Sequence, residues 1–178
     1  MNTLKLYPLA LRESYVKNIK QAGIEIPPEK YSNSIFKICL ILTGVVLILA
    51  TIFHQNFIYP IITFFVLQIF FYFKLGLKAS ARIKKMESFF PEVISLMSSN
   101  LRSGITIDSS FLLSARPEFD PLDKEILEAG KEISTGKEIV FALRAMSERI
   151  GSEKISKVIL LIISGLKAGG NISDLLEE

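Results

Sequence analysis

The stretch that decides the fold is Ile38–Phe73, ICLILTGVVLILATIFHQNFIYPIITFFVLQIFFYF, which contains no Asp, Glu, Lys or Arg in 36 residues. A single straight helix of this length would measure about 54 Å, whereas the hydrocarbon core of a bilayer is about 30 Å thick. The polar triplet His54-Gln55-Asn56 divides the stretch almost in half. The sequence therefore predicts two membrane-spanning helices, 35–53 and 57–73, joined by a tight turn.

The charges that flank the two spans predict their orientation. Five basic residues and no acidic residue lie between the second span and Glu87. Five basic residues precede the first span, and Lys37 lies in its first turn, against three acidic residues. The turn between the spans carries no Lys or Arg. The positive-inside rule then places both termini in the cytoplasm. The alternative, a buried helical hairpin of a soluble protein, would normally show a polar face on each helix, and neither span has one.

The N-terminal segment, 1–34, is predicted to be amphipathic. Residues 9–22 can form a helix with Leu11, Tyr15, Ile19 and Ala22 on one face, and Gly23 supplies a stop signal. Two prolines at 27 and 28 favour a stiff connector to the first span, because each restricts its own backbone and that of the preceding residue. This pattern is typical of a docking or interfacial helix. A poorly ordered basic tail is the open alternative.

Beyond the hairpin, 35–76, the residues 77–178 show regular helix punctuation. An apolar repeat from Phe90 to Leu101 predicts a first helix, within which Pro91 either starts the helix or kinks a longer one. Thr106 is a good N-cap for a second helix. Asp120-Pro121 predicts the start of a third, with proline at the first helical position, which ends near Gly136.

Three further helices complete the prediction for this segment. A fourth, 138–150, stops at Gly151, and a fifth opens at Ser152 or Glu153 and contains the stretch 158–166, which is apolar on all sides and is predicted to be the buried central helix. A sixth begins at Asn171 or Ser173. The fold class is therefore all-α, a two-span transmembrane hairpin followed by a cytoplasmic bundle of about six short helices. The predicted helix-stop glycines are Gly104, Gly136, Gly169 and Gly170.

The composition offers no support for a catalytic or cofactor site. The single cysteine, Cys39, and the single histidine, His54, provide neither a zinc site nor a Ser-His-Asp arrangement in the cytoplasmic segment. No Gly-rich phosphate loop is present. A net charge of +3 and the absence of tryptophan argue against nucleic-acid binding. The carboxylates between Asp120 and Glu138 alternate with lysines and are predicted to form a solvated face. The alternatives are a catalytic or divalent-cation role and a docking face for a charged partner.

Several short stretches resemble the type II secretion system F domain. They are FPE and LRSGITI at 90–92 and 101–107, STGK, AL and MSER within 134–149, and LKAGGNI and LLE within 166–177. The upstream stretch QAGI…PPEKY, within 21–31, is similar to archaeal and Tad-type members. The family includes the polytopic platform proteins of type II secretion, type IV pili, Tad pili and the archaeal flagellum.

The resemblance implies a function and a set of partners. Such proteins lie in the cytoplasmic membrane as oligomers, are not enzymes, and contact a hexameric secretion ATPase through their cytoplasmic domain, passing its motion to pilin-like subunits. Members continue past the double glycine into at least one more span, whereas this chain stops at Glu178, so we expect a truncated member. The competing hypothesis is a membrane-tethered regulator or sensor; a membrane enzyme is a third.

Under the platform hypothesis, the residues that contact partners are expected to be exposed and polar, at the membrane-distal end of the bundle. The alternative is that these are ordinary surface charges with small individual energies. The candidates are Arg102, Asp108, Lys137, Glu138, Arg144 and Glu148.

Overall fold

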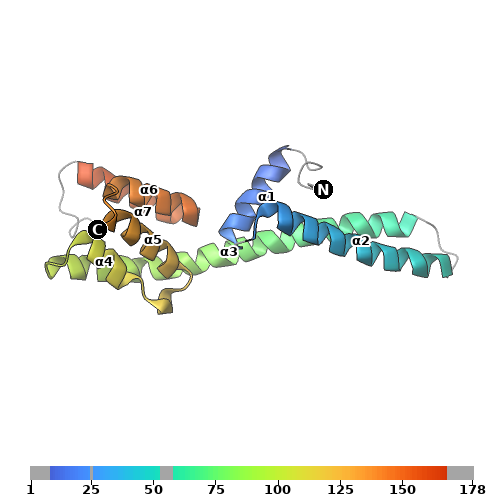
Figure 1. The fold of residues 1–178 in the computed structure, drawn as a ribbon, viewed down its shortest axis with the longest axis horizontal. Coiled ribbons are helices and arrows are strands. Elements are labelled where there is room, and N and C mark those ends of the chain that lie inside the picture. Colours follow the sequence, from blue (N-terminus) through green and yellow to red (C-terminus); the bar gives the residue numbers. More distant parts are fainter. Residues whose placement is uncertain (1–8, 25, 53–57, 168–178) are drawn as a thin grey trace. The chain divides into compact units, whose positions relative to one another are not determined.

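The computed structural model describes residues 9–24, 26–52 and 58–167, and every regular element within them is helical (Figure 1). The predicted all-α fold, with two apolar helices ahead of a helical bundle, is confirmed. The predicted turn at 54–56, the sixth helix, Gly169 and Gly170 lie outside the described residues. The helices are α1 Leu9–Gln21, α2 Pro28–Ile52, α3 Ile58–Arg102, α4 Ile107–Ser114, α5 Leu122–Ser134, α6 Ile139–Ile150 and α7 Glu153–Lys167, with a 3-10 turn, η2, at Pro117–Phe119.

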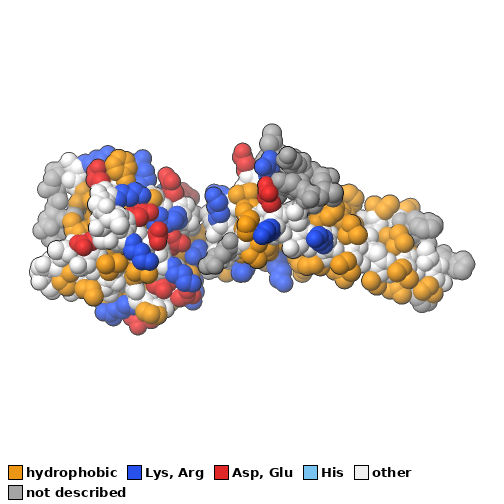
Figure 2. All heavy atoms as spheres, in the orientation of Figure 1, with side chains coloured by type: hydrophobic (Ala, Val, Ile, Leu, Met, Phe, Trp, Pro, Cys, Tyr) orange, Lys and Arg blue, Asp and Glu red, His pale blue; other side chains and the backbone are white. Residues whose placement is uncertain are grey.

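The chain divides into two compact units, Met1–Ser80 and Ala81–Glu178, with α3 contributing to both. The three-part division into 1–34, 35–76 and 77–178 stays a prediction. In the first unit, α2 and α3 are long and apolar enough to cross a membrane. Only 17% and 11% of their most apolar windows is buried, whereas the core helix of a soluble protein would be mostly buried. Figure 2 shows these exposed apolar side chains in orange. Both helices are thus candidate membrane spans.

Helix α1 is packed against the hairpin through the face that its sequence predicts. Tyr15, Ile19 and Ala22 are buried together with Leu75 and Ala79 of α3. Leu11, predicted on the same face, is instead exposed, because this contact covers only the C-terminal half of α1. The helix ends before Gly23, whose φ of 67° is the left-handed conformation that glycine adopts without steric cost.

Helix α3 runs through both the second predicted span and the first predicted bundle helix without interruption. Its 45 residues include Pro91. This proline therefore does not start a helix but lies inside a longer one. Pro91 is exposed. The segment between Phe73 and Leu101 contains Gly76 but no pair of stop signals, which explains why the helix continues.

The core of the second unit is apolar and is shared by all its helices. Its best-buried members recur at helical spacing on α3, α5, α6 and α7, while α4 and η2 each add one phenylalanine. These core residues are Met86, Val93, Met97, Phe111, Phe119, Leu122, Ile126, Ala129, Met146, Ile150, Ile155 and Ile159.

Two expectations about this unit are wrong. Pro121 is not the first helical residue, because α5 begins at Leu122 and Pro121, after a cis bond to Asp120, occupies its N-cap. Helix α7 is not buried all round: Ile159 and Ile162 face the core, whereas Leu161 is 72% exposed. A bundle of so few helices covers one side of α7, so the other side stays open.

Candidate functional site

Two glutamates on α5 lie beside the core rather than on a solvated face. Glu125 and Glu132 are separated by seven residues, and Ala129 between them is fully buried, so all three share one side of the helix. The side chains of Glu125 and Glu132 are only 14% and 21% exposed. The expectation of a solvated acidic face is therefore wrong for these two carboxylates, although Asp120 and Lys124 do form an exposed i,i+4 pair.

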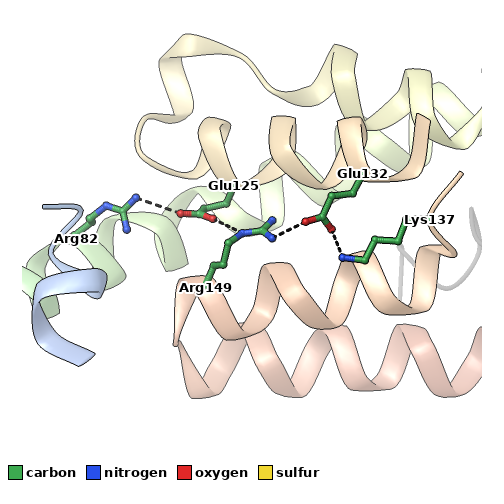
Figure 3. A network of polar contacts seen from close by, with 5 residues as sticks. All are labelled: Arg82, Glu125, Glu132, Lys137 and Arg149. Atoms are coloured by element: carbon green, nitrogen blue, oxygen red, sulfur yellow. Dashed lines mark hydrogen bonds and ion pairs between the residues drawn. The ribbon is translucent and has the colours of Figure 1, made fainter. Parts of the chain in front are cut away.

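A chain of ion pairs connects these glutamates to α3 and α6 (Figure 3). Arg82 of α3 lies 3.4 Å from Glu125. Arg149 of α6 donates from Nε to Glu125 and from Nη1 to Glu132, each over 3.0 Å. Lys137, in the α5–α6 connection, donates to the other oxygen of Glu132 over 2.8 Å. We call these five residues the charged network.

Arg149 is the centre of the charged network, because its planar guanidinium bridges two carboxylates at once. The hydrogen bond from Lys137 is the main cause that lowers the pKa of Glu132, and the charge of Arg149 lowers it further. Glu132 is therefore ionised at neutral pH. Removing one member of such a partly buried arrangement leaves an opposite charge without its partner.

A second polar contact joins α3 to the start of α7. The hydroxyl of Ser152 donates to Glu87 over 2.6 Å and accepts from the backbone N–H of Ile155 over 3.2 Å, so Ser152 also caps α7. Lys154 lies 3.2 Å from the same carboxylate. The hydrogen bond from Ser152 is the largest cause that lowers the pKa of Glu87. Together with the ion pair between Arg82 and Glu125, it joins α3 to α5 and to the start of α7.

These polar contacts connect helices and show no catalytic arrangement. Within residues 9–24, 26–52 and 58–167, no group of three or more His, Cys, Asp or Glu side chains could hold a metal ion. The network pairs carboxylates with cations whose role is electrostatic. The arrangement is a partly buried network of charges that joins α5 to α6 and to α3.

The six predicted partner-binding residues fall into three places. Arg102 is the exposed last residue of α3, and Asp108 lies in the first turn of α4, where a hydrogen bond from Thr106 lowers its pKa. Lys137 and Glu138 form the connection into α6, with Lys137 also in the charged network. Arg144 and Glu148 are exposed on α6, one turn apart.

The first two of these places share one end of the bundle. Ile94 of α3 and Ile139 of α6 line the same small apolar cavity, so the end of α3 lies near the start of α6. Helix α4 packs back on α3 through a hydrogen bond from Ser110 to the carbonyl of Met97. Four of the six candidates, Arg102, Asp108, Lys137 and Glu138, therefore belong to this end. Arg144 and Glu148 follow α6 away from it.

The sequence analysis missed Arg82, Glu125, Glu132 and Arg149. A signal was available for the glutamates, because their spacing with Ala129 is the i, i+4, i+7 pattern of one helix face. No comparable signal exists for Arg149, whose partners lie 17 and 24 residues away in the sequence.

Comparison with protein families bears on the bundle. Residues 93–178 match the family model of type II secretion system (T2SS), protein F. We call this segment the F domain, after the family model that it matches. The resemblance noted from the sequence is confirmed for these residues, just under half of the chain. The F domain includes Glu125, Glu132, Lys137 and Arg149, whereas Arg82 precedes it.

The F domain indicates the general class of the protein. Members of this family are structural platform proteins of the inner membrane in secretion and pilus systems. No curated protein and no solved structure matches the chain.

Proposed function

We propose that the chain is a component of the assembly platform of a type II secretion, type IV pilus or archaeal flagellum-like machine, in which it couples a secretion ATPase to the assembly of pilin-like subunits. One observation carries the proposal. The segment that matches the T2SS F family model begins on the same uninterrupted helix, α3, whose first part is a candidate membrane span. A structural element common to a membrane anchor and a cytoplasmic bundle suits a protein that transmits movement rather than one that performs chemistry.

The charged network gives this coupling a physical basis. Arg149 ties α6 to α5 through Glu125 and Glu132, and Glu125 is tied to α3 through Arg82. A force applied to α5 or α6 would therefore reach α3 through ion pairs as well as through the apolar core. Core contacts resist compression, and Arg149, which bridges two carboxylates of α5, adds resistance to sliding of α6 along α5.

We place the ATPase contact at the end of the bundle that carries Arg102, Asp108, Lys137 and Glu138. Charges of both signs are exposed there, which favours electrostatic recognition of a partner. Arg144 and Glu148 on α6 extend the proposed surface. Contacts of this kind are weakened by salt.

Capture of a secretion ATPase tests the contact. The full chain, purified in detergent, is immobilised and exposed to the host's hexameric secretion ATPase at low and at moderate salt. We expect capture that falls as salt rises, and that falls further in the K137Q/E138Q/R102Q variant. The matched control is K124Q/E128Q/K131Q, which alters exposed charges on α5. Capture of a soluble signalling protein instead of an ATPase would support the membrane-tethered regulator.

We also propose a multi-pass arrangement with both termini in the cytoplasm, where α2 and the first part of α3 span the inner membrane. Cysteine labelling in intact cells tests it. In a C39S background, a cysteine in place of Asn56, outside the described residues, should react with an impermeant reagent, whereas one in place of Glu128 should react only after lysis. The reverse pattern would contradict the orientation.

A homo-oligomer is the last part of the proposal. Large apolar side chains are exposed on the bundle. They are Leu160 and Leu161 on the open side of α7, and Phe141 of α6. Such surface is commonly covered in an assembly. Crosslinking in membranes should yield dimers or larger species, and L161E should reduce them while K157E leaves them unchanged. A monomer at all concentrations would refute this part.

A further inference from the structure

The first unit carries a strong excess of positive charge. Its described residues include seven Lys and Arg side chains but only two glutamates, Glu13 and Glu29. An excess of this size on a small unit favours an anionic ligand. Figure 2 shows blue side chains over α1 and beside it.

Four of these cations lie on α1 and α3 within two residues of the point where the two helices meet. A β-carbon added at Gly76 would lie 3.9 Å from the side-chain nitrogen of Asn18, so the two helices meet at these two residues. Lys17 and Lys20 flank Asn18 on α1, and Lys74 and Lys78 flank Gly76 on α3. All four lysines are exposed, which leaves their ammonium groups available to a ligand. We call them the crossing lysines, Lys17, Lys20, Lys74 and Lys78.

The crossing is fixed in position by a cluster of tyrosines. The rings of Tyr15 and Tyr72 are stacked with centroids 6.1 Å apart, and Tyr31 of α2 lies 6.4 Å from Tyr15. The hydroxyl of Tyr72 is 3.0 Å from that of Ser14. Tyrosines are typical of the membrane–water interface, where an apolar ring and a polar hydroxyl are both accommodated.

Apolar side chains next to the crossing lysines indicate that the ligand lies in a membrane surface. Phe73 and Leu77 of α3 are largely exposed and alternate with Lys74 and Lys78. A ligand at this surface would also find a hollow of about 520 Å³ along α1, which is lined by Arg12, Glu13, Val16, Lys17 and Lys20. An acidic protein could pair with the lysines, but it would not require an exposed phenylalanine beside them. A phospholipid accounts for both features, because its phosphate pairs with lysines and its acyl chains contact apolar side chains.

We propose that the crossing lysines bind the phosphate groups of anionic phospholipids at the cytoplasmic surface of the membrane. The lysines supply point charges, α1 holds two of them at the level where the apolar surface of α3 ends, and the tyrosine cluster keeps α1 there. Each lysine near a negatively charged surface adds to the attraction. The proposal concerns lipid recognition by the first unit and does not depend on an ATPase partner.

Native mass spectrometry of the full chain tests the proposal. The protein is extracted into detergent containing equal amounts of phosphatidylglycerol and phosphatidylcholine, and the lipids that remain bound are counted. We expect the wild type to retain phosphatidylglycerol preferentially. In the K17Q/K20Q/K74Q/K78Q variant, the ratio of bound phosphatidylglycerol to bound phosphatidylcholine should fall at least about tenfold. The matched control, K124Q/K131Q/K157Q/K167Q, removes four exposed lysines of the second unit and should keep it.

A second variant guards against loss of folding. K17R/K20R/K74R/K78R retains the charges and should retain phosphatidylglycerol, because an arginine also pairs with phosphate. Equal retention of both lipids by the wild type would overturn the proposal and favour an acidic protein as the partner. So would an equal loss of preference in the glutamine variant and in its control.

Discussion

Among substitutions that change the side-chain volume little, we expect the loss of Arg149 to destabilise the bundle most. Its guanidinium is the only described cation that bridges both Glu125 and Glu132. We expect R149M to lower the free energy of unfolding by about 2 kcal/mol, less than the full cost of breaking a buried pair because the side chain is about one third exposed. Denaturant unfolding of the full chain in detergent measures it.

The control for this prediction lies on the same helix. R144M removes an exposed arginine of α6 and should change the free energy of unfolding by less than about 0.5 kcal/mol. Equal effects of the two substitutions would mean that the charged network adds no stability.

Acid should destabilise the bundle through Glu87 and Glu132. The pKa of each lies below the ordinary value of 4.5, so the folded state binds fewer protons than the unfolded state as the pH falls through this range. The stability that they contribute is present above pH 4.5 and is lost as the pH falls through their folded pKa values. Thermal unfolding between pH 6 and pH 3 should show the loss.

Substitution of Glu87 measures how much of this loss of stability in acid is due to Glu87. E87Q should reduce the stability at pH 6 and flatten the dependence on pH, because the group that Ser152 and Lys154 stabilise no longer titrates. E148Q, which removes an exposed carboxylate of α6, is the control and should retain the wild-type slope. An unchanged slope in E87Q would contradict the role assigned to this contact.

Among the elements, α4 and α5 approach most closely at Gly130. A β-carbon there would lie 3.1 Å from the β-carbon of Phe111 and 3.0 Å from Leu112. Phe111 is in the core, so its β-carbon cannot shift without moving α4. We expect G130A to destabilise the bundle by about 1 kcal/mol, since overpacking outweighs the helix propensity gained.

A neutral substitution on the same helix provides the comparison for G130A. E128A places alanine at an exposed position, gains little helix propensity and should leave the unfolding midpoint almost unchanged. If G130A instead raised the midpoint, the contact between α4 and α5 would be looser than described.

Element boundaries were predictable wherever the signal was local. The predicted fourth helix, 138–150, ends at the same residue as α6, because Gly151 takes φ 68° in a left-handed cap, and begins one residue earlier. The continuity of α3, the open side of α7 and the pairing of Arg149 were not predictable, since each depends on which helices become neighbours. Of the candidate site, the sequence indicated Lys137 but neither of the two carboxylates between which Arg149 lies.

At the scale of the whole molecule, the exposed apolar surface of α2 should commit the chain to the membrane. Ile48 is exposed within the predicted first span, 35–53. An arginine at the centre of a spanning helix costs roughly 2.5–3.5 kcal/mol on insertion scales. We expect I48R to reduce the fraction of the protein that resists alkaline extraction from membranes.

The control for I48R is L11R, which adds the same charge to an exposed position on α1. It should remain in the membrane fraction like the wild type. Release of the wild-type chain by alkaline extraction would show that α2 and α3 are covered by protein rather than by lipid.

The aromatic composition of the two units gives each a separate optical signal. All five tyrosines, including Tyr15, Tyr31 and Tyr72 of the cluster, precede residue 81, and the chain has no tryptophan. Intrinsic tyrosine emission therefore reports on the first unit alone. A tryptophan in place of Phe119, which is buried in the second unit, would emit at longer wavelength and report on the bundle. One sample could then reveal whether anchor and bundle melt together or in succession.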